Sequence, residues 1–181
     1  MTRYISILRG INVSGHKKIK MADLKALYEK QGFKNVVTYI QSGNVIFEAP
    51  SNDLHNIKLQ IEVAIEKKYS FHVDVQLRSE SELNETCSKL PFENINLEQD
   101  GSKVLVTFLS GQPDAKAFDQ LSKYAAPSEK LMLGDRVLYL HCPDGYGKTK
   151  LSNVLIEKKL NQISTTRNLR TVVKLCELAK E

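Results

Sequence analysis

The order of β-rich runs and amphipathic stretches is the feature of this sequence that most constrains its fold. In the first half, the runs RYISIL, VVTYI, NVIFEA and FHVDVQL are typical of strands, and apolar residues recur every three or four positions in two stretches between them. The predicted order is strand, helix, strand, strand, helix, strand. Gly32-Phe33 indicates the end of the first helix, and Gln41-Ser42-Gly43 indicates a hairpin between the two middle strands.

Local signals refine the ends of these elements. Pro50 and Ser51 precede the second helix, and in FHVDVQL the apolar residues alternate with polar ones. That alternation predicts a strand with one face exposed to water. The run from Ser79 to Glu82 is a capping box, which predicts a short helix continuing through Cys87.

A second set of elements follows a polar segment without periodicity. KVLVTFL predicts a strand, and EKLML and RVLYLHC predict two more, joined by a glycine-first turn at Gly134-Asp135. We also expect helices over residues 114–124, 148–160 and 168–180, with a short strand over 162–164. The order of the first half is therefore repeated, followed by one more helix.

This repetition predicts an α+β fold of two ferredoxin-like (βαββαβ) halves plus a C-terminal helix. We expect the first half, with its short capping helix, at residues 1–90, a linker at 91–102, and the second half with the C-terminal helix at 103–181. The halves share no obvious residue identity, so the repetition concerns element order only.

Composition indicates a folded protein of the reducing cytoplasm. The 181 residues are 41% hydrophobic, and 26 Lys and Arg oppose 21 Asp and Glu, a net charge of +5. Three cysteines without close spacing suggest neither a disulfide framework nor a zinc knuckle. The apolar stretch before Arg9 is too short for a signal peptide, and no later run approaches the ~20 apolar residues of a membrane span. We therefore expect no membrane partner, and the sequence leaves the oligomeric state open.

Positive charge is concentrated in two segments. Residues 1–20 carry a net charge of +5 and residues 145–176 carry +6, so the rest of the chain carries −6. Clustered positive charge attracts phosphates, nucleic acid or acidic proteins. Dispersal of these lysines over a solvated surface is the alternative interpretation.

The predicted topology brings distant loops together. In a split βαβ unit, the loop after the first strand and the hairpin after the second strand lie at the same end of the sheet. In the second half, the loop after the third strand meets the entry to the last helix. The residues that we expect in the first set are Arg9, Gly10, Asn12, Lys17, Gln41, Ser42 and Asn44, and those in the second set are Gly145, Gly147, Lys148, Thr166, Arg167 and Asn168.

Both sets combine glycines, amide side chains and cations, which are the groups that bind an oxyanion. The alternative is that the glycines and amides serve turns only. The segment from Cys142 to Thr149 nearly matches G-x-x-x-x-G-K-[ST], the phosphate loop of nucleotide hydrolases. Cys142 replaces the first glycine and Pro143 removes an amide donor, so this segment favours simple anion binding at a helix start over hydrolysis.

Metal and catalytic chemistry have little support in the residue spacing. His16, His55, His72 and His141 stand apart from one another and from the cysteines, so we expect neither a metal site nor a cofactor. His16 is the one histidine that we would test as an acid or base, and the spacing assigns no nucleophile elbow, zinc-protease pair or carboxylate dyad.

Several strings of the chain resemble one bacterial family. RGINVSG, YIQSGNVIF, LHCPDGYGKTKL and TTRNLRTVVKL are similar, in matching order, to the family catalogued as domain of unknown function 1697. The resemblance implies an α+β fold of two ferredoxin-like parts and adds Lys150 to the candidate ligand-binding residues. The family usually has tryptophan at the position of Leu169, so a stacking role for that aromatic is absent here.

Three classes of function follow from these features. The first is a protein that binds a phosphorylated small molecule at the basic loops, with nucleic acid as the second candidate ligand. The next is an enzyme acting on a phosphorylated or carboxylated substrate, in which Arg9 and Arg167 stabilise negative charge. The third is a structural or interaction module in which the loops only pack.

Overall fold

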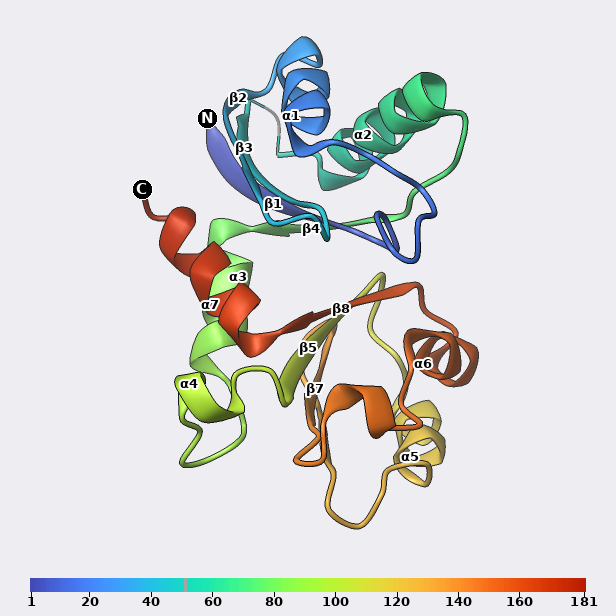
Figure 1. Cartoon of the computed structure of the whole chain (residues 1–181). Helices are drawn as coiled ribbons and strands as arrows, with labels where there is room; N and C mark the ends of the chain where they lie inside the picture. Colours follow the sequence, from blue (N-terminus) through green and yellow to red (C-terminus); the bar gives the residue numbers. More distant parts are fainter. Residues whose placement is uncertain (51) are drawn as a thin grey trace. The chain divides into compact units, whose positions relative to one another are not determined.

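The computed structural model contains two four-stranded antiparallel sheets (Figure 1). It describes residues 1–50 and 52–181, so Ser51 lies outside the described residues. The strands are β1 (Thr2–Leu8), β2 (Lys34–Tyr39), β3 (Asn44–Ala49), β4 (Val75–Ser79), β5 (Val104–Leu109), β6 (Lys130–Leu133), β7 (Val137–His141) and β8 (Ser164–Asn168). The helices are α1 (Met21–Lys30), α2 (Leu54–Tyr69), α3 (Glu80–Ser88), α4 (Leu97–Asp100), α5 (Ala115–Ser122), α6 (Asn153–Leu160), α7 (Leu169–Leu178) and the 3₁₀ turn η1 (Tyr146–Lys148).

The chain forms two compact units. Unit 1 comprises residues 1–84 and 175–181, and unit 2 comprises residues 85–174. This grouping differs from the expected boundaries at three places. Residues 85–90, expected at the end of the first half, belong to unit 2. Residues 175–181 belong with the first unit, and the expected linker contains the short helix α4 within unit 2.

Unit 1 has the strand order β2-β3-β1-β4. β1 runs antiparallel to both β3 and β4, and β2 runs antiparallel to β3, which confirms the ferredoxin-like arrangement. Helices α1 and α2 cover one face of this sheet (Figure 1). Their apolar residues pack with the sheet around Tyr28 and Phe47, whose ring centroids lie 5.3 Å apart.

Unit 2 repeats this arrangement with the order β6-β7-β5-β8. β5 is buried along its whole length and pairs antiparallel with β7 and β8. Leu121 of α5 and Ile156 of α6 pack against Leu105, Leu109 and Leu138 of the sheet. The two units therefore share one topology, as the element order predicts.

Local signals in the sequence explain several element ends. Glu82 N–H donates to Ser79 Oγ over 3.2 Å, and Ser79 N–H donates to Glu82 Oε2 over 2.7 Å, so the predicted capping box starts α3. Gly32 follows α1 with a φ of +90°, which confirms it as the residue that ends that helix.

The exposed face predicted for FHVDVQL is found only in part, because His72 is exposed and Asp74 is half-buried before β4, whereas Gln76 within the strand is buried. Along β4, the polar residues Gln76 and Arg78 alternate with Val75 and Leu77, and all four are buried. Arg78 Nη1 donates to the backbone oxygen of Leu77 over 2.8 Å. Period-two alternation separates polar from apolar side chains, but it does not show whether the polar ones meet water or buried partners.

The turn between β6 and β7 also differs from expectation. Gly134 does not take a positive φ, and the left-handed residue is Arg136, with a φ of +49°. A Cβ on Gly134 would lie 2.8 Å from the side chains of both Tyr139 and Val137. This glycine is therefore required by close packing rather than by the conformation of a glycine-first turn.

We predict that Gly43→Ala destabilises the protein more than Gly10→Ala. Both glycines are left-handed, with φ of +81° and +65°, so each substitution costs about 1 kcal/mol in backbone strain. At Gly43 the new Cβ would also lie 3.0 Å from Leu8 Cβ and 2.5 Å from Ile11 Cδ1, whereas the space at Gly10 is open. Overpacking should add about 1–3 kcal/mol, measured as the free energy of unfolding in urea. Equal losses for the two variants would contradict this account.

Candidate functional site

The first predicted loop set meets through Asn12. Its Nδ2 donates to the backbone oxygens of Ile19 and Gln41 over 2.9 and 2.8 Å, and its Oδ1 accepts from the N–H of Ile19 over 2.9 Å. The loop after β1 and the β2–β3 hairpin therefore lie together, as the topology predicts. The bonds to Ile19 close the loop after β1, and the bond to Gln41 joins that loop to the hairpin.

The side chains of Asn44 and Lys17 in this set also contact the protein itself. Asn44 is buried and donates to the oxygen of Tyr39 over 3.0 Å and to Ser42 Oγ over 3.2 Å. Lys17 Nζ donates to the oxygen of His72 over 2.7 Å. Arg9 is half-buried and its backbone N–H donates to the oxygen of Asp74 over 2.9 Å. Gly10 is exposed beside these residues, and ligand binding by this set stays a prediction.

In the second set, the residues predicted to form the entry to the last helix lie on β8 instead. Thr166 pairs with Thr107 of β5, and the two hydroxyl oxygens are 2.7 Å apart. The β-branched residues Thr165 and Thr166 favour a strand, which extends beyond the predicted closing strand of 162–164. Asn168 Oδ1 accepts from the N–H of Thr171 over 2.9 Å, so this asparagine caps α7.

Arg167 is buried on this strand. It is 8% exposed, and its Nη1 donates to Thr165 Oγ1 over 3.1 Å and to the oxygen of Thr166 over 2.9 Å. Burial lowers the pKa of the guanidinium to about 10. Access of a dissolved anion to this side chain is therefore restricted.

The segment 145–150 does not form the helix start of a phosphate loop. The predicted helix over 148–160 begins only at Asn153, after Ser152, whose Oγ accepts from Leu155 N–H. Residues 146–148 instead form η1, in which Lys148 N–H donates to the oxygen of Gly145 over 3.1 Å and Thr149 N–H to that of Tyr146 over 3.4 Å. Ser152 is a stronger helix start than the glycine-rich run before it, and the amides of Lys148 and Thr149 are used internally.

The lysines of this segment line a cavity. Its volume is about 350 Å³, and we call it the lysine pocket. Lys148 and Lys150, both predicted as ligand-binding residues, lie on it together with Lys123, which follows α5. The complete lining is Lys123, Tyr124, Ala125, Ala126, Pro127, Glu129, Lys148, Thr149 and Lys150.

A fourth lysine contacts the wall of the pocket. Lys159 Nζ of α6 lies 4.8 Å from the centroid of the Tyr124 ring. A hydrogen bond from Lys159 is the largest cause that holds the pKa of Tyr124 below its ordinary value. Glu129 is the single acid of the lining, and its Oε2 accepts from the N–H of Ala126 over 2.8 Å. The pocket is therefore strongly electropositive.

Cys142 lies next to this pocket and is buried. Burial, followed by the charge of Glu129, raises the pKa of its thiol to about 11. The thiol is therefore neutral at physiological pH, which makes it a poor nucleophile.

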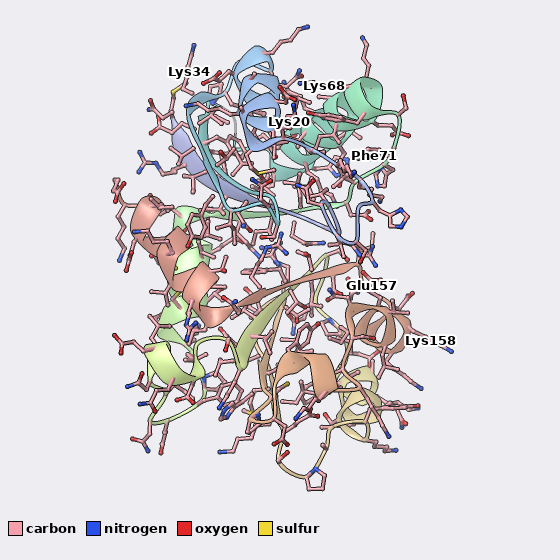
Figure 2. All side chains as sticks on the ribbon, viewed as in Figure 1. Lys20, Lys34, Lys68, Phe71, Glu157 and Lys158 are labelled. Carbon is pink, nitrogen blue, oxygen red and sulfur yellow. The ribbon has the colours of Figure 1, made fainter. Side chains whose placement is uncertain are left out.

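Sequence reasoning missed Lys123, Tyr124 and Lys159. They come from the end of α5 and from α6, and Figure 2 shows the neighbouring Glu157 and Lys158 on α6. The basic excess of residues 145–176 includes Lys159, but Lys123 lies outside that segment. Only the packing of α5 beside α6 brings them to one cavity.

We predict that Asn12→Ala lowers stability by about 1–3 kcal/mol, because it removes one hydrogen bond to the β2–β3 hairpin and two within the loop after β1. Ser14→Ala is the matched control, since both residues lie in the same loop with φ of +56° and +49° and Ser14 is exposed. Thermal and urea unfolding give the comparison. A loss for Asn12→Ala no larger than that for Ser14→Ala would show that these bonds contribute nothing.

We also predict that Lys159→Ala raises the pKa of Tyr124. The hydrogen bond from the ammonium group stabilises the phenolate, so its removal should shift ionisation to higher pH. The ultraviolet absorbance of tyrosinate is followed as pH rises. The difference between the titrations of the wild type and of Tyr124→Phe gives the ionisation of Tyr124 alone. An unchanged titration would place Lys159 away from the phenol in solution.

Comparisons with known proteins agree with this fold. Among the described residues, no helix is long and apolar enough to cross a membrane. The conserved bacterial protein SP0830 from Streptococcus pneumoniae has a solved structure that aligns with a TM-score of 0.78 and 24% sequence identity, covering 98% of each chain. At this identity, the likeness shows the fold alone.

A search of curated proteins found no match. The family model described as "Protein of unknown function (DUF1697)" matches residues 1–139, which include the first loop set and Lys123. The chain therefore belongs to the DUF1697 family.

Proposed function

We propose that this protein binds a phosphorylated small molecule in the lysine pocket. The observation that carries the proposal is the convergence of Lys123, Lys148 and Lys150 on one cavity. Ammonium groups attract phosphate as compact point charges, and several around one cavity reinforce each other. All three are exposed, so their desolvation cost is small and the ligand can reach them.

The remaining lining suits the non-phosphate part of such a ligand. Ala125, Ala126 and Pro127 provide a small apolar surface beside the ring of Tyr124. Thr149 Oγ1 accepts from the N–H of Leu151 over 3.1 Å, and its side chain also hydrogen-bonds Cys142, so this residue holds the wall of the pocket in place. The volume of about 350 Å³ lies at the lower end of the range for small-molecule sites, so we propose a small metabolite.

A cytoplasmic location is part of the same proposal. Cys87, Cys142 and Cys176 form no disulfide in the described part of the chain, which is typical of a reducing compartment. Phosphorylated metabolites are compatible with that location.

The test is a titration of the full chain with inorganic pyrophosphate and with a nucleoside monophosphate, followed by calorimetry. The double variant Lys148→Ala/Lys150→Ala should weaken binding by about twofold to thirtyfold, because each exposed charge pair contributes about 0.2–1 kcal/mol. Lys116→Ala is the control, since Lys116 is an exposed lysine of α5 outside the lining. Affinity should fall as salt is raised.

Two outcomes would contradict the proposal. One is no binding of either phosphate compound by the wild type at low salt. The other is equal weakening by Lys116→Ala and by the double variant, which would indicate attraction to the overall charge. Tighter binding of an oligonucleotide than of both compounds, weakened by the same double variant, would assign the pocket to nucleic acid instead.

A further inference from the structure

Unit 1 carries a cluster of metal-ligating side chains between α2 and β4. His72 and Asp74 lie just before β4, two residues apart, and Glu62 and Glu66 are one turn apart on α2. Residues i and i+2 of an extended chain point to the same side, and residues i and i+4 of a helix share a face. Phe71, labelled in Figure 2, precedes this segment, and its ring stacks on Tyr69 at the end of α2 with centroids 5.8 Å apart.

The ligating atoms are close enough to share one ion. His72 Nε2 lies 3.1 Å from Asp74 Oδ1, and one ligand atom each of Glu62, His72 and Asp74 lie within 4.8 Å of one another. Two ligands at about 2.0–2.2 Å from a tetrahedral zinc ion are separated by roughly 3.5 Å. Small side-chain rotations would therefore bring the three atoms to coordination distance.

The donor set is mixed, which distinguishes it from an exposed group of acids. One imidazole nitrogen with two carboxylates suits zinc and neighbouring transition ions better than calcium or magnesium. His72 Nδ1, on the other side of the ring, lies 3.8 Å from Glu66 Oε2. That carboxylate is placed to orient the ring while Nε2 binds the ion, as carboxylates do for ligating histidines.

The backbone around the cluster is anchored at several points. Val75 N–H donates to Glu62 Oε1 over 2.8 Å, which positions that carboxylate. The oxygen of His72 accepts from Lys17 Nζ over 2.7 Å, and the oxygen of Asp74 accepts from Arg9 N–H over 2.9 Å. These bonds hold the segment against the loop after β1. Two cations oppose metal binding here: Lys58 Nζ lies 3.7 Å from Glu62 Oε1, and the ammonium group of Lys17 lies at the backbone oxygen of His72.

We propose that Glu62, His72 and Asp74 bind one divalent transition-metal ion of the zinc class, with Glu66 orienting His72. This site lies on unit 1 and is independent of the phosphate site proposed on unit 2. The spacing of the histidines in the sequence did not predict it, because the donors come from a helix and from a segment ten or more residues away.

Calorimetric titration of the metal-free full chain with zinc chloride tests the proposal. The wild type should bind one ion, and His72→Ala and Asp74→Asn should each weaken binding at least about tenfold. His55→Ala is the matched control, because His55 is an exposed histidine of α2 outside the cluster. Cobalt absorption of the wild type should show nitrogen and oxygen ligands and should be lost in His72→Ala.

A variant that should bind zinc more tightly is also needed, because a misfolded protein would lose affinity rather than gain it. Lys58→Ala removes the competing ammonium, so it should bind zinc more tightly than the wild type. Absence of one-to-one zinc binding by the wild type would overturn the proposal. Equal effects of His55→Ala and His72→Ala would also overturn it, as would unchanged or weaker binding by Lys58→Ala.

Discussion

Each unit depends on a first strand that pairs on both sides. β1 lies between β3 and β4, and β5 lies between β7 and β8, antiparallel in every case. Such a strand satisfies its backbone N–H and C=O groups without water, so it can be buried on both faces. Its two neighbours then fix which loops meet at each end of the sheet. The hydrogen bond from Asn12 to the hairpin and the pairing of Asn168 with Leu105 both follow from that arrangement of strands.

Burial divides the cations of unit 2 into two groups with different roles. Arg167 lies on β8 with hydrogen bonds to its own strand, and its guanidinium is desolvated. The lysines of the pocket follow helix or turn ends, where their ammonium groups stay in water. A buried arginine with internal partners contributes to the structure, whereas an exposed lysine can exchange water for a phosphate oxygen. The proposed site therefore lies on the lysines.

Much of the fold could be predicted because its signals are local. The capping box at Ser79, the glycine at Gly43 in the hairpin and the apolar periodicity of α1 each act over a few residues. The predicted ends of elements are wrong where two local signals compete. Ser152 is a better helix start than Lys148, and the threonines of β8 extend a strand whose length depends on pairing with β5. Partner strands, rather than local preference, decide such ends.

The candidate sites were less predictable than the fold. Lys148 and Lys150 were found through their basic, glycine-containing surroundings, but Lys123 and Lys159 have no such signal. The grouping of Glu62 with His72 and Asp74 likewise depends on how α2 lies beside β4. Element order, turns and caps were determined by the sequence itself, because they depend on neighbouring residues. Tertiary structure alone decided which polar groups are buried and which charges share a cavity, because both depend on the packing of segments far apart along the chain.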